Sequence, residues 1–430
     1  MPRTLAQWLA YQEGVHPRSI ELGLDRVRKV WQRMGAPSPA RCVITVGGTN
    51  GKGSTVALIE AMLRVAGRRV GCYTSPHLLR YNERVRIDGY DVTDDALVGA
   101  FERIEAARTS NGEAVPLTYF EYGTLAALDL FARADLDVAV LEVGLGGRLD
   151  AVNIIDADAV VITTIDLDHM DWLGNDRDSI GREKAGIARR GRPAIVGESD
   201  PPAGLLDALA ACGAQVQRAG HDFRVERHVR GWRWQHRDGT VFDLPDPALA
   251  APVQYANAAA ALAVLHALGS GGDRSVPVEL GEAAAAGLEA VRVPARLQAL
   301  GGDPLLVVDV GHNPQAARAL ADWLQVRRFA RVHAVYGALA DKDVAGVLAA
   351  LGPQVDHWHL AGLDGDSPRG LSIGGLSETI RRTLPLAVSD AHPDVSAALA
   401  AARAQARPGE CILAFGSFFV ASAVLAEPAS

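Results

Sequence analysis

The strongest chemical signal in the sequence is the run Gly48-Thr49-Asn50-Gly51-Lys52-Gly53-Ser54. An apolar stretch, Val43–Val46, precedes it and a helix-like stretch from Thr55 to Val65 follows it, which is the layout of a phosphate-binding loop. The glycines expose backbone N–H groups, and the helix N-terminus adds a partial positive charge. Lys52 can reach terminal phosphates, and Ser54 can hold a magnesium ion. The run therefore predicts ATP binding.

The match to the standard phosphate-binding loop is incomplete. The standard pattern has a glycine five positions before Gly51, where this chain has Val46, and a hydroxyl directly after the lysine, where it has Gly53. The alternative is a glycine-rich turn between a strand and a helix that binds no ligand. Because the lysine and both flanking elements are present, phosphate binding is the favoured interpretation.

An acid, Glu142, ends the apolar run Val138–Leu141. Ligands of doubly wound sheets gather at the carboxyl ends of the strands, where an acid beside a phosphate-binding loop is a natural magnesium ligand. The alternative is an ion pair with a lysine or arginine, and the phosphate-binding loop favours the metal. The next run, Gly144 to Asp150, has Leu149 where the dinucleotide fingerprint has its last glycine, so it predicts a close backbone approach to a ligand instead.

Two more candidates follow the next strand. His169 comes after the apolar run Val160–Ile165, on the same predicted edge as Glu142, and a neutral imidazole can bind a divalent metal. An isolated histidine more commonly has a structural role than a metal-binding one. The position of His169 at a strand end favours metal binding but does not decide between the two roles. Lys184 lies beside a glutamate in a helical stretch and by itself indicates a surface lysine.

A second strand-end group is the run Asp309-Val310-Gly311-His312-Asn313-Pro314, which predicts another site at a carboxyl edge. Arg296 precedes it and could bind a phosphate with its fixed fork or form a salt bridge in a linker. Two domains could therefore close on one nucleotide.

These residues need a framework that brings strand ends together. Short β-rich runs alternate with helix-length segments, which predicts an α/β fold with a doubly wound, mostly parallel sheet covered on both faces. The segment from about Ala211 to Leu244 differs, and its turn signals predict a small antiparallel side sheet. A helical region follows from Gln254 to about Ala290, and a Rossmann-like α/β pattern begins after Pro294. We therefore predict two domains, residues 1–293 and 294–430.

The predicted elements can be placed approximately. Strands are expected at Cys42–Val46, Val70–Tyr73, Val138–Val143, Ala159–Ile165, Ala194–Val196, Leu305–Val310, Val332–Tyr336, Val355–Leu360 and Cys411–Phe415. Helices are expected at Val56–Val65, Leu97–Ala107, Phe120–Ala132, Ile180–Ala188, Gln315–Leu324 and Val344–Leu351.

The composition limits the possible functions. With 430 residues the chain is too long for one hydrophobic core. A net charge of −8 argues against general binding of nucleic acid or anionic membranes. The four cysteines form no CxxC pair and fit neither a disulfide framework nor a zinc site. The N-terminus lacks the core of a signal peptide and no 18-residue apolar segment is present, so we expect a cytoplasmic protein.

Taken together, the motifs resemble the bifunctional dihydrofolate synthase/folylpolyglutamate synthase family of the Mur ligase superfamily. Gly48–Ser54 resembles that superfamily's own phosphate-binding loop, which accounts for both departures noted above. The resemblance extends from Ile20 to Phe419. The other runs that carry it are Tyr73–Leu78, Asn82–Arg84, Glu142–Ala151, Asp168–His169, Glu183–Ile187, Asp309–Pro314 and Phe415–Phe418.

The resemblance implies roles for these positions. ATP would be bound by Thr49, Asn50, Gly51, Lys52, Gly53, Ser54, Asn257, Arg296, Asp309 and His312. Two Mg²⁺ sites would be formed by Ser75, Glu142, His169 and Lys184, the last as a carbamate. The pterin or folate would contact Glu21, Leu22, Gly23, Thr118, Tyr119, Phe120, Glu121, Leu149, Asp150 and Ala151. The implied catalytic residues are Lys52, Lys184 and His312.

The resemblance also implies the reaction. A carboxylate would attack the γ-phosphate of ATP, and the amine of L-glutamate would attack the resulting acyl phosphate to form an amide. The acceptors would be dihydropteroate and reduced folates, and the family is expected to be monomeric. This chain departs from the family pattern at Ala295, where glycine is common, and at Gly311, where alanine is common.

Three alternatives remain open from the sequence. The chain could be a folylpolyglutamate synthase only. It could be a cell-wall Mur ligase, although only about 40 residues precede the strand of the phosphate-binding loop, too few for a UDP-binding domain. It could also be a nucleotide-dependent binding protein, which would not need Glu142, His169 and Lys184 together.

Overall fold

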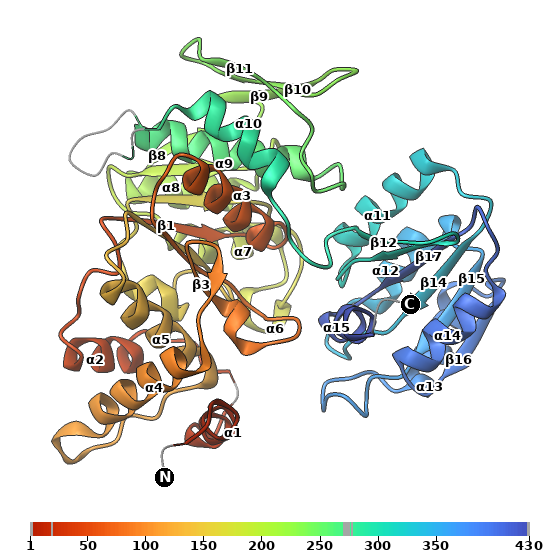
Figure 1. Cartoon of the computed structure of the whole chain (residues 1–430), viewed down its shortest axis with the longest axis horizontal. Helices are drawn as coiled ribbons and strands as arrows, with labels where there is room; N and C mark the ends of the chain where they lie inside the picture. The colour runs from red at the N-terminus through yellow and green to blue at the C-terminus, as the bar shows by residue number, and fades with distance from the viewer. Residues whose placement is uncertain (1–2, 19, 270–275, 277, 428–430) are drawn as a thin grey trace. The chain divides into compact units, whose positions relative to one another are not determined.

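The computed structural model describes residues 3–18, 20–269, 276 and 278–427 (Figure 1). The chain separates into two compact units. The first consists of Met1–Ala248 and Tyr255–Val291, and the second of Leu249–Gln254 and Arg292–Ser430. Each unit has its own cluster of buried apolar side chains.

An eight-stranded sheet forms the centre of the first unit, in the order β4-β3-β2-β5-β1-β6-β7-β8. Neighbouring strands pair in parallel along the part β2-β5-β1-β6-β7-β8. Strands β3 and β4 form an antiparallel edge next to β2. Strands β1, β2, β5 and β6 are buried along their whole length, which confirms the predicted parallel sheet covered on both faces. The strands are β1 Cys42–Gly47, β2 Val70–Tyr73, β3 Val85–Ile87, β4 Tyr90–Asp91, β5 Val138–Glu142, β6 Ala159–Ile162, β7 Pro193–Val196 and β8 Gln215–Arg218.

Helices flank this sheet, and polar residues fix where several of them begin. Thr118 caps the first turn of α5 in a reciprocal pair with Glu121, and Asp176 caps α7. Helices α4 and α5 pack together, whereas α3 packs against α10 (Figure 1). The helices are α1 Leu5–Val15, α2 Asp25–Arg33, α3 Lys52–Val65, α4 Asp94–Thr109, α5 Tyr119–Arg133, α6 Met170–Leu173, α7 Arg177–Ala185, α8 Ala203–Cys212, α9 Gln254–Gly269 and α10 Leu280–Ala290, with short 3-10 turns at Tyr81–Arg84, Ser110–Gly112 and Ala151–Ile154.

The predicted antiparallel side sheet is present as β11-β10-β9, with strands at Phe223–Arg227 (β9), Trp232–His236 (β10) and Val241–Leu244 (β11). Trp232 and Trp234 are both buried, and Trp234 Nε1 donates a hydrogen bond to Ala259 O of α9 (3.3 Å). The sheet begins later than predicted, because Gln215–Arg218 pairs with β7 and extends the main sheet instead.

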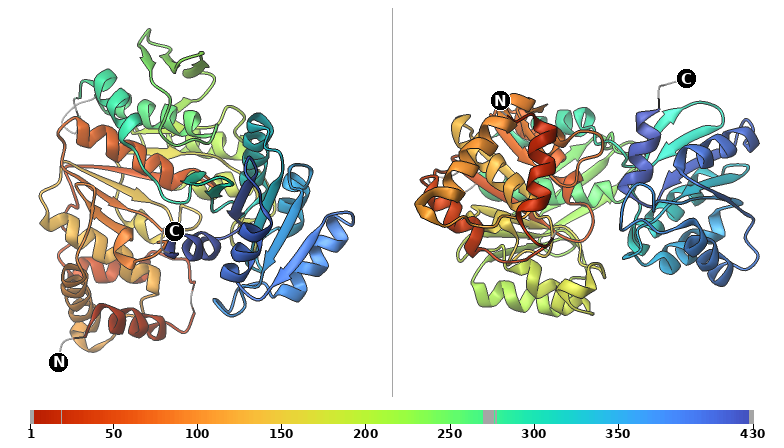
Figure 2. Two further views of the ribbon diagram at one scale, coloured as in Figure 1. Left: turned by 45° about the vertical axis from the view of Figure 1, so that its right-hand side comes forward. Right: turned by 90° about the horizontal axis from the view of Figure 1, so that it is seen from below.

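A six-stranded sheet in the order β12-β13-β17-β14-β15-β16 forms the second unit. All neighbours pair in parallel except β12 and β13. Helices lie on both of its faces, as the views in Figure 2 show. The elements are β12 Gln298–Gly301, β13 Leu305–Val308, α11 Pro314–Arg327, β14 Val332–Tyr336, α12 Val344–Leu351, a 3-10 turn at Gly352–Gln354, β15 His357–Ala361, α13 Ile373–Thr383, β16 Ser389–His392, α14 Val395–Gln405, β17 Cys411–Phe415 and α15 Phe418–Ala426.

Most predicted elements lie where expected, and the differences have local causes. Strand β6 ends at Ile162 rather than Ile165, because Thr163 and Thr164 turn to bind the loop after β1. Across the described residues, we find no helix that combines the length and the low polarity needed to cross a membrane.

The contact between α3 and α10 yields a first prediction. Gly287 of α10 lies so close to α3 that a Cβ atom there would be 2.9 Å from both Met62 N and Met62 Cα. Because backbone atoms cannot rotate away, we expect Gly287→Ala to destabilise the protein by about 1–3 kcal/mol. Urea unfolding followed by tryptophan fluorescence measures this change.

Gly14→Ala is the matched control. Gly14 lies in α1, and a Cβ atom added there would meet no atom within 4 Å, so the same substitution should leave stability unchanged or raise it by about 0.5–1 kcal/mol. Equal unfolding midpoints for the two variants would contradict the close helix contact.

Candidate functional site

The candidate site lies at the carboxyl edge of the main sheet, where β5, β1 and β6 end side by side. The strand registers pair Val46 with Glu142 and Gly47 with Ile162. The loop after β1, the acid at the end of β5 and the loop after β6 therefore start at the same level. This is the edge at which open α/β sheets bind ligands.

Hydrogen bonds attach the phosphate-binding loop to the residues after β6. Thr163 Oγ1 donates to Asn50 O (2.6 Å) and to Gly47 O (3.2 Å), and Thr49 N donates to Thr164 O (2.7 Å). Gly48 has φ +140°, and a Cβ atom there would collide with the Thr163 hydroxyl. The loop thus needs glycine at position 48 for both space and backbone conformation.

The second half of the loop begins α3 and contacts α9. Gly51 has φ +85° and precedes Lys52, the first residue of α3. A Cβ atom at Gly51 would lie 2.5 Å from Asn257 Oδ1. Helix α9 therefore places Asn257, a residue predicted to bind ATP, against the loop. Lys52 Nζ bends back and donates to Gly48 O (3.1 Å) and Thr49 O (3.0 Å).

Lys184 also reaches the phosphate-binding loop. Its side chain is buried, and Nζ donates to Gly48 O at 3.0 Å, the same oxygen that Lys52 contacts. Burial and the charge of Lys52 lower the pKa of Lys184 to about 7, against the opposing effect of Asp168 and Asp150. The interpretation of Lys184 as a surface lysine, which its neighbours in the sequence favour, is therefore wrong.

A glycine-rich turn holds the helix that carries Lys184. A Cβ atom at Gly147 would lie 2.9 Å from Glu183 O and 3.0 Å from Lys184 Cα. Arg148 N donates to Glu183 O (2.9 Å), and the Arg148 guanidinium pairs with the Glu183 carboxylate (2.8 Å). The close backbone approach predicted for this run is thus made to the protein's own α7 at Gly147.

The Glu142 carboxylate lies beside the start of α3. Ser75 N donates to Glu142 Oε2 (3.1 Å), and a Cβ atom at Gly53 would be 3.6 Å from the same oxygen. Glu142 is buried. Hydroxyl and carboxylate oxygens are the donors that Mg²⁺ prefers, so the residues present fit a hard divalent cation beside the phosphate-binding loop.

His169 lies on the loop that follows β6. Thr49 Oγ1 donates to Asp166 O (3.1 Å) and accepts from Asp166 N (3.0 Å), which places this loop beside the phosphate-binding loop. His169 adopts a left-handed conformation, with φ +53°, and its N–H donates to Asp168 Oδ1 (2.9 Å). The imidazole is 35% exposed, so it is accessible to a ligand at this edge.

An acid and an arginine that we did not predict support this loop. Glu198 Oε1 accepts from Ile165 N (3.1 Å), Arg177 Nε donates to Ile165 O (2.8 Å), and the two side chains pair at 3.2 Å. Burial raises the pKa of Glu198 to about 7. Glu198 follows β7, so its place at the end of an apolar strand is the sequence signal that could have identified it.

The segments predicted to bind the pterin also come together. Arg26 donates to Glu21 Oε1 (3.0 Å) and to Glu121 Oε1 (3.1 Å), and Gly23 N donates to Leu149 O (3.2 Å). Arg26 was not predicted, because only the fold brings Glu121 close to it. The structure thus joins the early Glu21–Gly23 segment to the start of α5 and to the glycine-rich turn. The remaining pterin candidates lie in these same segments, namely Leu22, Thr118, Tyr119, Phe120, Asp150 and Ala151.

Aromatic rings line the region between these segments. The Phe120 ring packs against Gly144, where a Cβ atom would be 2.5 Å from Phe120 Cζ, and lies 6.0 Å from the Tyr73 ring. The Tyr119 and Tyr81 rings meet edge to face at 5.6 Å. Flat rings of this kind can contact a flat heterocycle.

Asp150 links the pterin segments to the lysines. Its carboxylate accepts from Leu145 N (2.8 Å) and Val152 N (3.0 Å). Burial raises the pKa of Asp150 to about 6, while these hydrogen bonds and the charge of Lys52 act in the opposite direction. The side chain thus helps to shape the turn and also lies within the electrostatic reach of Lys52.

The second unit gathers its own predicted residues at the end of β13. Asp309 accepts from Leu297 N (2.7 Å) and Gly311 N (2.8 Å), and burial raises its pKa. The Phe418 ring lies 5.7 Å from the Arg296 guanidinium and 6.4 Å from the His312 ring. Arg296, Asp309 and His312 therefore form one group in this unit, with Phe418 as a member we had not selected.

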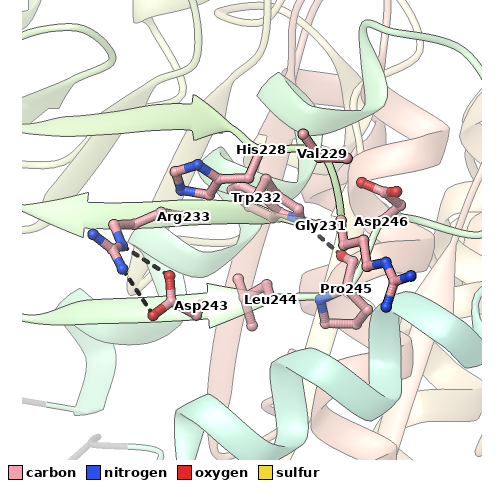
Figure 3. Close-up of a pocket in the computed structure, with 10 residues that line it drawn as sticks. His228, Val229, Gly231, Trp232, Arg233, Asp243, Leu244, Pro245 and Asp246 are labelled. Atoms are coloured by element: carbon pink, nitrogen blue, oxygen red, sulfur yellow. Dashed lines mark hydrogen bonds and ion pairs between the residues drawn. The ribbon is translucent and has the colours of Figure 1, made fainter.

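A separate pocket lies on the side sheet of the first unit (Figure 3). Trp232 Nε1 donates to Pro245 O (2.9 Å) on one side, and Arg233 pairs with Asp243 (2.8 Å) on the other (Figure 3). None of the predicted site residues lines it. We therefore place the candidate chemistry at the sheet edge and not in this pocket.

Comparison with known proteins identifies relatives along nearly the whole chain. Two family models match, the Mur ligase middle domain over residues 46–265 and the Mur ligase glutamate ligase domain over residues 295–418. The dihydrofolate synthase/folylpolyglutamate synthase of Escherichia coli (strain K12) is 45% identical over 423 residues, which cover 98% of this chain and 94% of that protein.

Solved structures agree with this comparison. The FolC protein of E. coli, in complex with DHPP and ADP, superimposes with a TM-score of 0.91 at 43% identity, covering 98% of this chain and 97% of that one. A bifunctional folylpolyglutamate synthase/dihydrofolate synthase with Mn, AMPPNP and L-glutamate bound gives a TM-score of 0.88 at 46% identity, covering 99% and 98% of the two chains.

The attachment of the phosphate-binding loop to β6 can be tested at Thr163. Thr163→Val keeps the shape of the side chain but removes the hydroxyl that donates to Asn50 O and Gly47 O. Because a hydrogen bond contributes about 1 kcal/mol, we expect ATP affinity to fall by about 5-fold, measured by calorimetric titration. Thr163→Ser retains the hydroxyl and should bind ATP like the wild type. Equal affinities for the valine and serine variants would contradict this role.

Proposed function

This chain belongs to the dihydrofolate synthase/folylpolyglutamate synthase family within the Mur ligases, and from that premise we propose how its residues add L-glutamate to 7,8-dihydropteroate and to reduced folates. It is an ATP-dependent, amide-forming ligase that uses a divalent cation. The observation that supports the residue assignment best is the meeting of Lys52 and Lys184 at one oxygen of the phosphate-binding loop.

The reaction activates a carboxylate in two displacements. The carboxylate oxygen of the pterin substrate attacks the γ-phosphorus of ATP, and the bond from this phosphorus to the bridging oxygen breaks, which gives an acyl phosphate and ADP. The glutamate amine then attacks the acyl carbon, loses a proton and displaces phosphate. No protein atom becomes covalently bound, so the chain contributes position and charge.

We assign the nucleotide to the phosphate-binding loop. The N–H groups of Gly51, Gly53 and Ser54 lie at the N-terminus of α3, which favours phosphate. Lys52 Nζ lies at the carbonyl oxygens of this loop, within reach of transferring phosphates. Thr49, Asn50 and Asn257 complete the assignment in this unit, and we propose that Arg296, Asp309 and His312 of the second unit also contact ATP, with His312 taking part in catalysis.

Ser75, Glu142 and His169 are the proposed protein ligands of a first divalent cation. The oxygens of Ser75 and Glu142 suit Mg²⁺ or Mn²⁺, and we propose that His169 adds one imidazole to this oxygen-rich set. Such an ion, when bound, neutralises negative charge on phosphate oxygens. The support in this chain is the hydrogen bond between Ser75 and Glu142 at the start of α3.

We propose that Lys184 reacts with carbon dioxide. A pKa of about 7 leaves much of the amine neutral at physiological pH, and only the neutral amine is nucleophilic. The amine nitrogen forms a bond to the carbon of CO₂ and loses one proton, which leaves a carbamate anion. A buried lysine would thereby become an acid-like ligand for a second cation.

The pterin would occupy the region formed by Glu21–Gly23, Thr118–Glu121 and Leu149–Ala151. Arg26 fixes two of these segments through its ion pairs with Glu21 and Glu121. Phe120 and Tyr119 offer ring surfaces to a flat heterocycle.

We also propose domain roles. Residues 1–293 would form the ATP-binding domain and residues 294–430 the glutamate-ligase domain, in keeping with the family matches at 46–265 and 295–418. A monomer acting in the cytoplasm, with no nucleic acid or membrane partner, remains our prediction.

The choice of acceptor can be measured directly. We expect phosphate release that requires L-glutamate with both 7,8-dihydropteroate and tetrahydrofolate, together with products heavier by one glutamate residue in mass spectrometry. Phosphate release with tetrahydrofolate but not with 7,8-dihydropteroate would indicate that the chain is a folylpolyglutamate synthase only. Release with neither acceptor, in the presence of ATP and Mg²⁺, would contradict the proposed function.

Lys184→Ala tests the proposed carbamate. Because the loss of a metal-site support reduces activity by about 10–100-fold, we expect kcat to fall at least that far while ATP binding is largely kept. Lys184→Arg should lose activity as well, since arginine retains a positive charge but forms no stable carbamate. Lys29→Ala, at an exposed lysine paired with Glu113, is the control and should remain active.

The carbamate can also be detected directly by NMR spectroscopy. Enzyme equilibrated with ¹³C-labelled bicarbonate should show a carbamate resonance in the ¹³C NMR spectrum that is absent from Lys184→Ala. Full turnover by the arginine variant, or a resonance that survives in the alanine variant, would remove Lys184 from this role.

A further inference from the structure

Histidines gather on three neighbouring strands of the second unit. We call the following residues the histidine cluster: His333 on β14, His357 and His359 on β15, and His392 on β16. The strands β17, β14 and β15 lie between β16 and β13, the strand that leads to Asp309. The cluster is therefore separate from the candidate site of this unit.

A chain of hydrogen bonds fixes the tautomers of two cluster members. His333 Nε2 lies 3.2 Å from Glu410 Oε2, and His333 Nδ1 lies 3.2 Å from His359 Nε2. An ionised carboxylate only accepts, so Nε2 of a neutral His333 carries the proton and Nδ1 presents a lone pair. His359 Nε2 must then donate, which leaves His359 Nδ1 as a bare acceptor.

Among the residues that the structure describes, this acceptor has no donor. His359 is fully buried, and among the described residues neither His359 Nδ1 nor His392 Nε2 has a hydrogen-bond partner, although both atoms are shielded from solvent. Buried polar atoms are nearly always partnered. A bare acceptor on His359 and an unpartnered ring nitrogen on His392 thus occur on adjacent strands.

A carboxylate completes the group. Donor atoms of His359, Asp390 and His392 all lie within 4.8 Å of one another. Bonds from zinc to imidazole nitrogen are about 2.0–2.1 Å, so small side-chain rotations would bring three such donors onto one ion. We propose that His359 Nδ1, His392 Nε2 and the Asp390 carboxylate bind a divalent transition-metal ion of the Zn²⁺ class.

The surrounding contacts suit such an ion. Two imidazoles and one carboxylate favour zinc and related metals, whereas Mg²⁺ prefers oxygen donors alone. His359 donates its other ring N–H to His333, and Asp390 also accepts from His357 Nε2 (3.0 Å), which are the outer contacts that typically orient metal ligands. Asp390 is exposed and His392 partly so, which gives the ion a path from solvent.

The bound ion would link strand β16 to strand β15. β16 is the edge strand of its sheet and is mostly exposed, with hydrogen bonding to β15 only. His359 belongs to β15, whereas Asp390 and His392 belong to β16. An ion shared by the two strands would therefore fasten the edge strand to the sheet.

A second group with metal-binding residue types provides the control. His236, Asp238 and His266 of the first unit also lie within 4.8 Å of one another. There, however, both Asp238 oxygens already pair with imidazoles, with His236 Nδ1 at 3.0 Å and His266 Nε2 at 2.8 Å. His236 Nε2 also lacks a partner among the described residues, but the carboxylate of this group is already occupied by two imidazoles, so we expect it to bind zinc poorly.

The test uses full-length protein stripped with EDTA and held in excess Mg²⁺. Calorimetric titration with Zn²⁺ should give one tight equivalent for the wild type and for His266→Gln. That equivalent should weaken by at least about 10-fold in His392→Gln and in Asp390→Asn. Co²⁺ should give a visible absorption band in the same two proteins that bind Zn²⁺ tightly.

Stability and exchange measurements separate binding from misfolding. Without metal, the variants should unfold at the temperature of the stripped wild type, and Asp390 is exposed enough for its substitution to be tolerated. Zn²⁺ should slow amide exchange in Ser389–His392 of the wild type but not of Asp390→Asn. If no tight equivalent is found, or if it is lost only in His266→Gln, the proposal is overturned.

Discussion

The carbonyl oxygen of Gly48 is the point on which the candidate site depends. Lys52 and Lys184 both donate to it, at 3.1 and 3.0 Å. Two ammonium groups this close in a buried region repel each other and lose hydration, so the folded state favours neutral Lys184, the more deeply buried of the two. The environment around one oxygen thus distinguishes two identical side chains, because Lys184 is buried and has a lowered pKa whereas Lys52 is partly exposed. The oxygen can face both lysines because Gly48 adopts a conformation that is unfavourable for other residues.

Parallel topology explains why so few residues suffice to build this site. β1 lies between β5 and β6, so a loop after the central strand meets an acid from one neighbour and hydroxyls from the other. Glu142, Thr163 and Lys52 are far apart in sequence and close in space for this reason alone. Helix α7, which carries Lys184, approaches the turn after β5 closely, and this approach requires space at the turn. Gly147 provides the space, because any side chain there would strike the α7 backbone.

The parts that could be predicted from the sequence are those with a local signal. Apolar runs gave the main strands, and the glycine-lysine run gave the phosphate-binding loop. Burial of Lys184 could not be read from its neighbours, because it results from packing against a turn 37 positions earlier, at Gly147. Arg26, Thr163 and Glu198 were missed because each acts on the backbone or charges of a distant segment. The histidines of β14 to β16 were missed for the same reason, since only strand pairing brings His359 and His392 together.

Backbone strain next to Arg296 shows how the second unit holds its own predicted group. Ala295 and Leu297 have φ of +53° and +48°, a conformation that costs non-glycine residues about 1 kcal/mol or more each. The strain is offset by specific contacts, because Ala295 O accepts from Val310 N (3.2 Å) and Leu297 N donates to Asp309 (2.7 Å). A glycine at position 295 would relax the first residue, because glycine adopts positive φ without steric cost. Alanine at this position therefore restricts the turn that carries Arg296, whose guanidinium lies 5.7 Å from the Phe418 ring and acts electrostatically on Asp309.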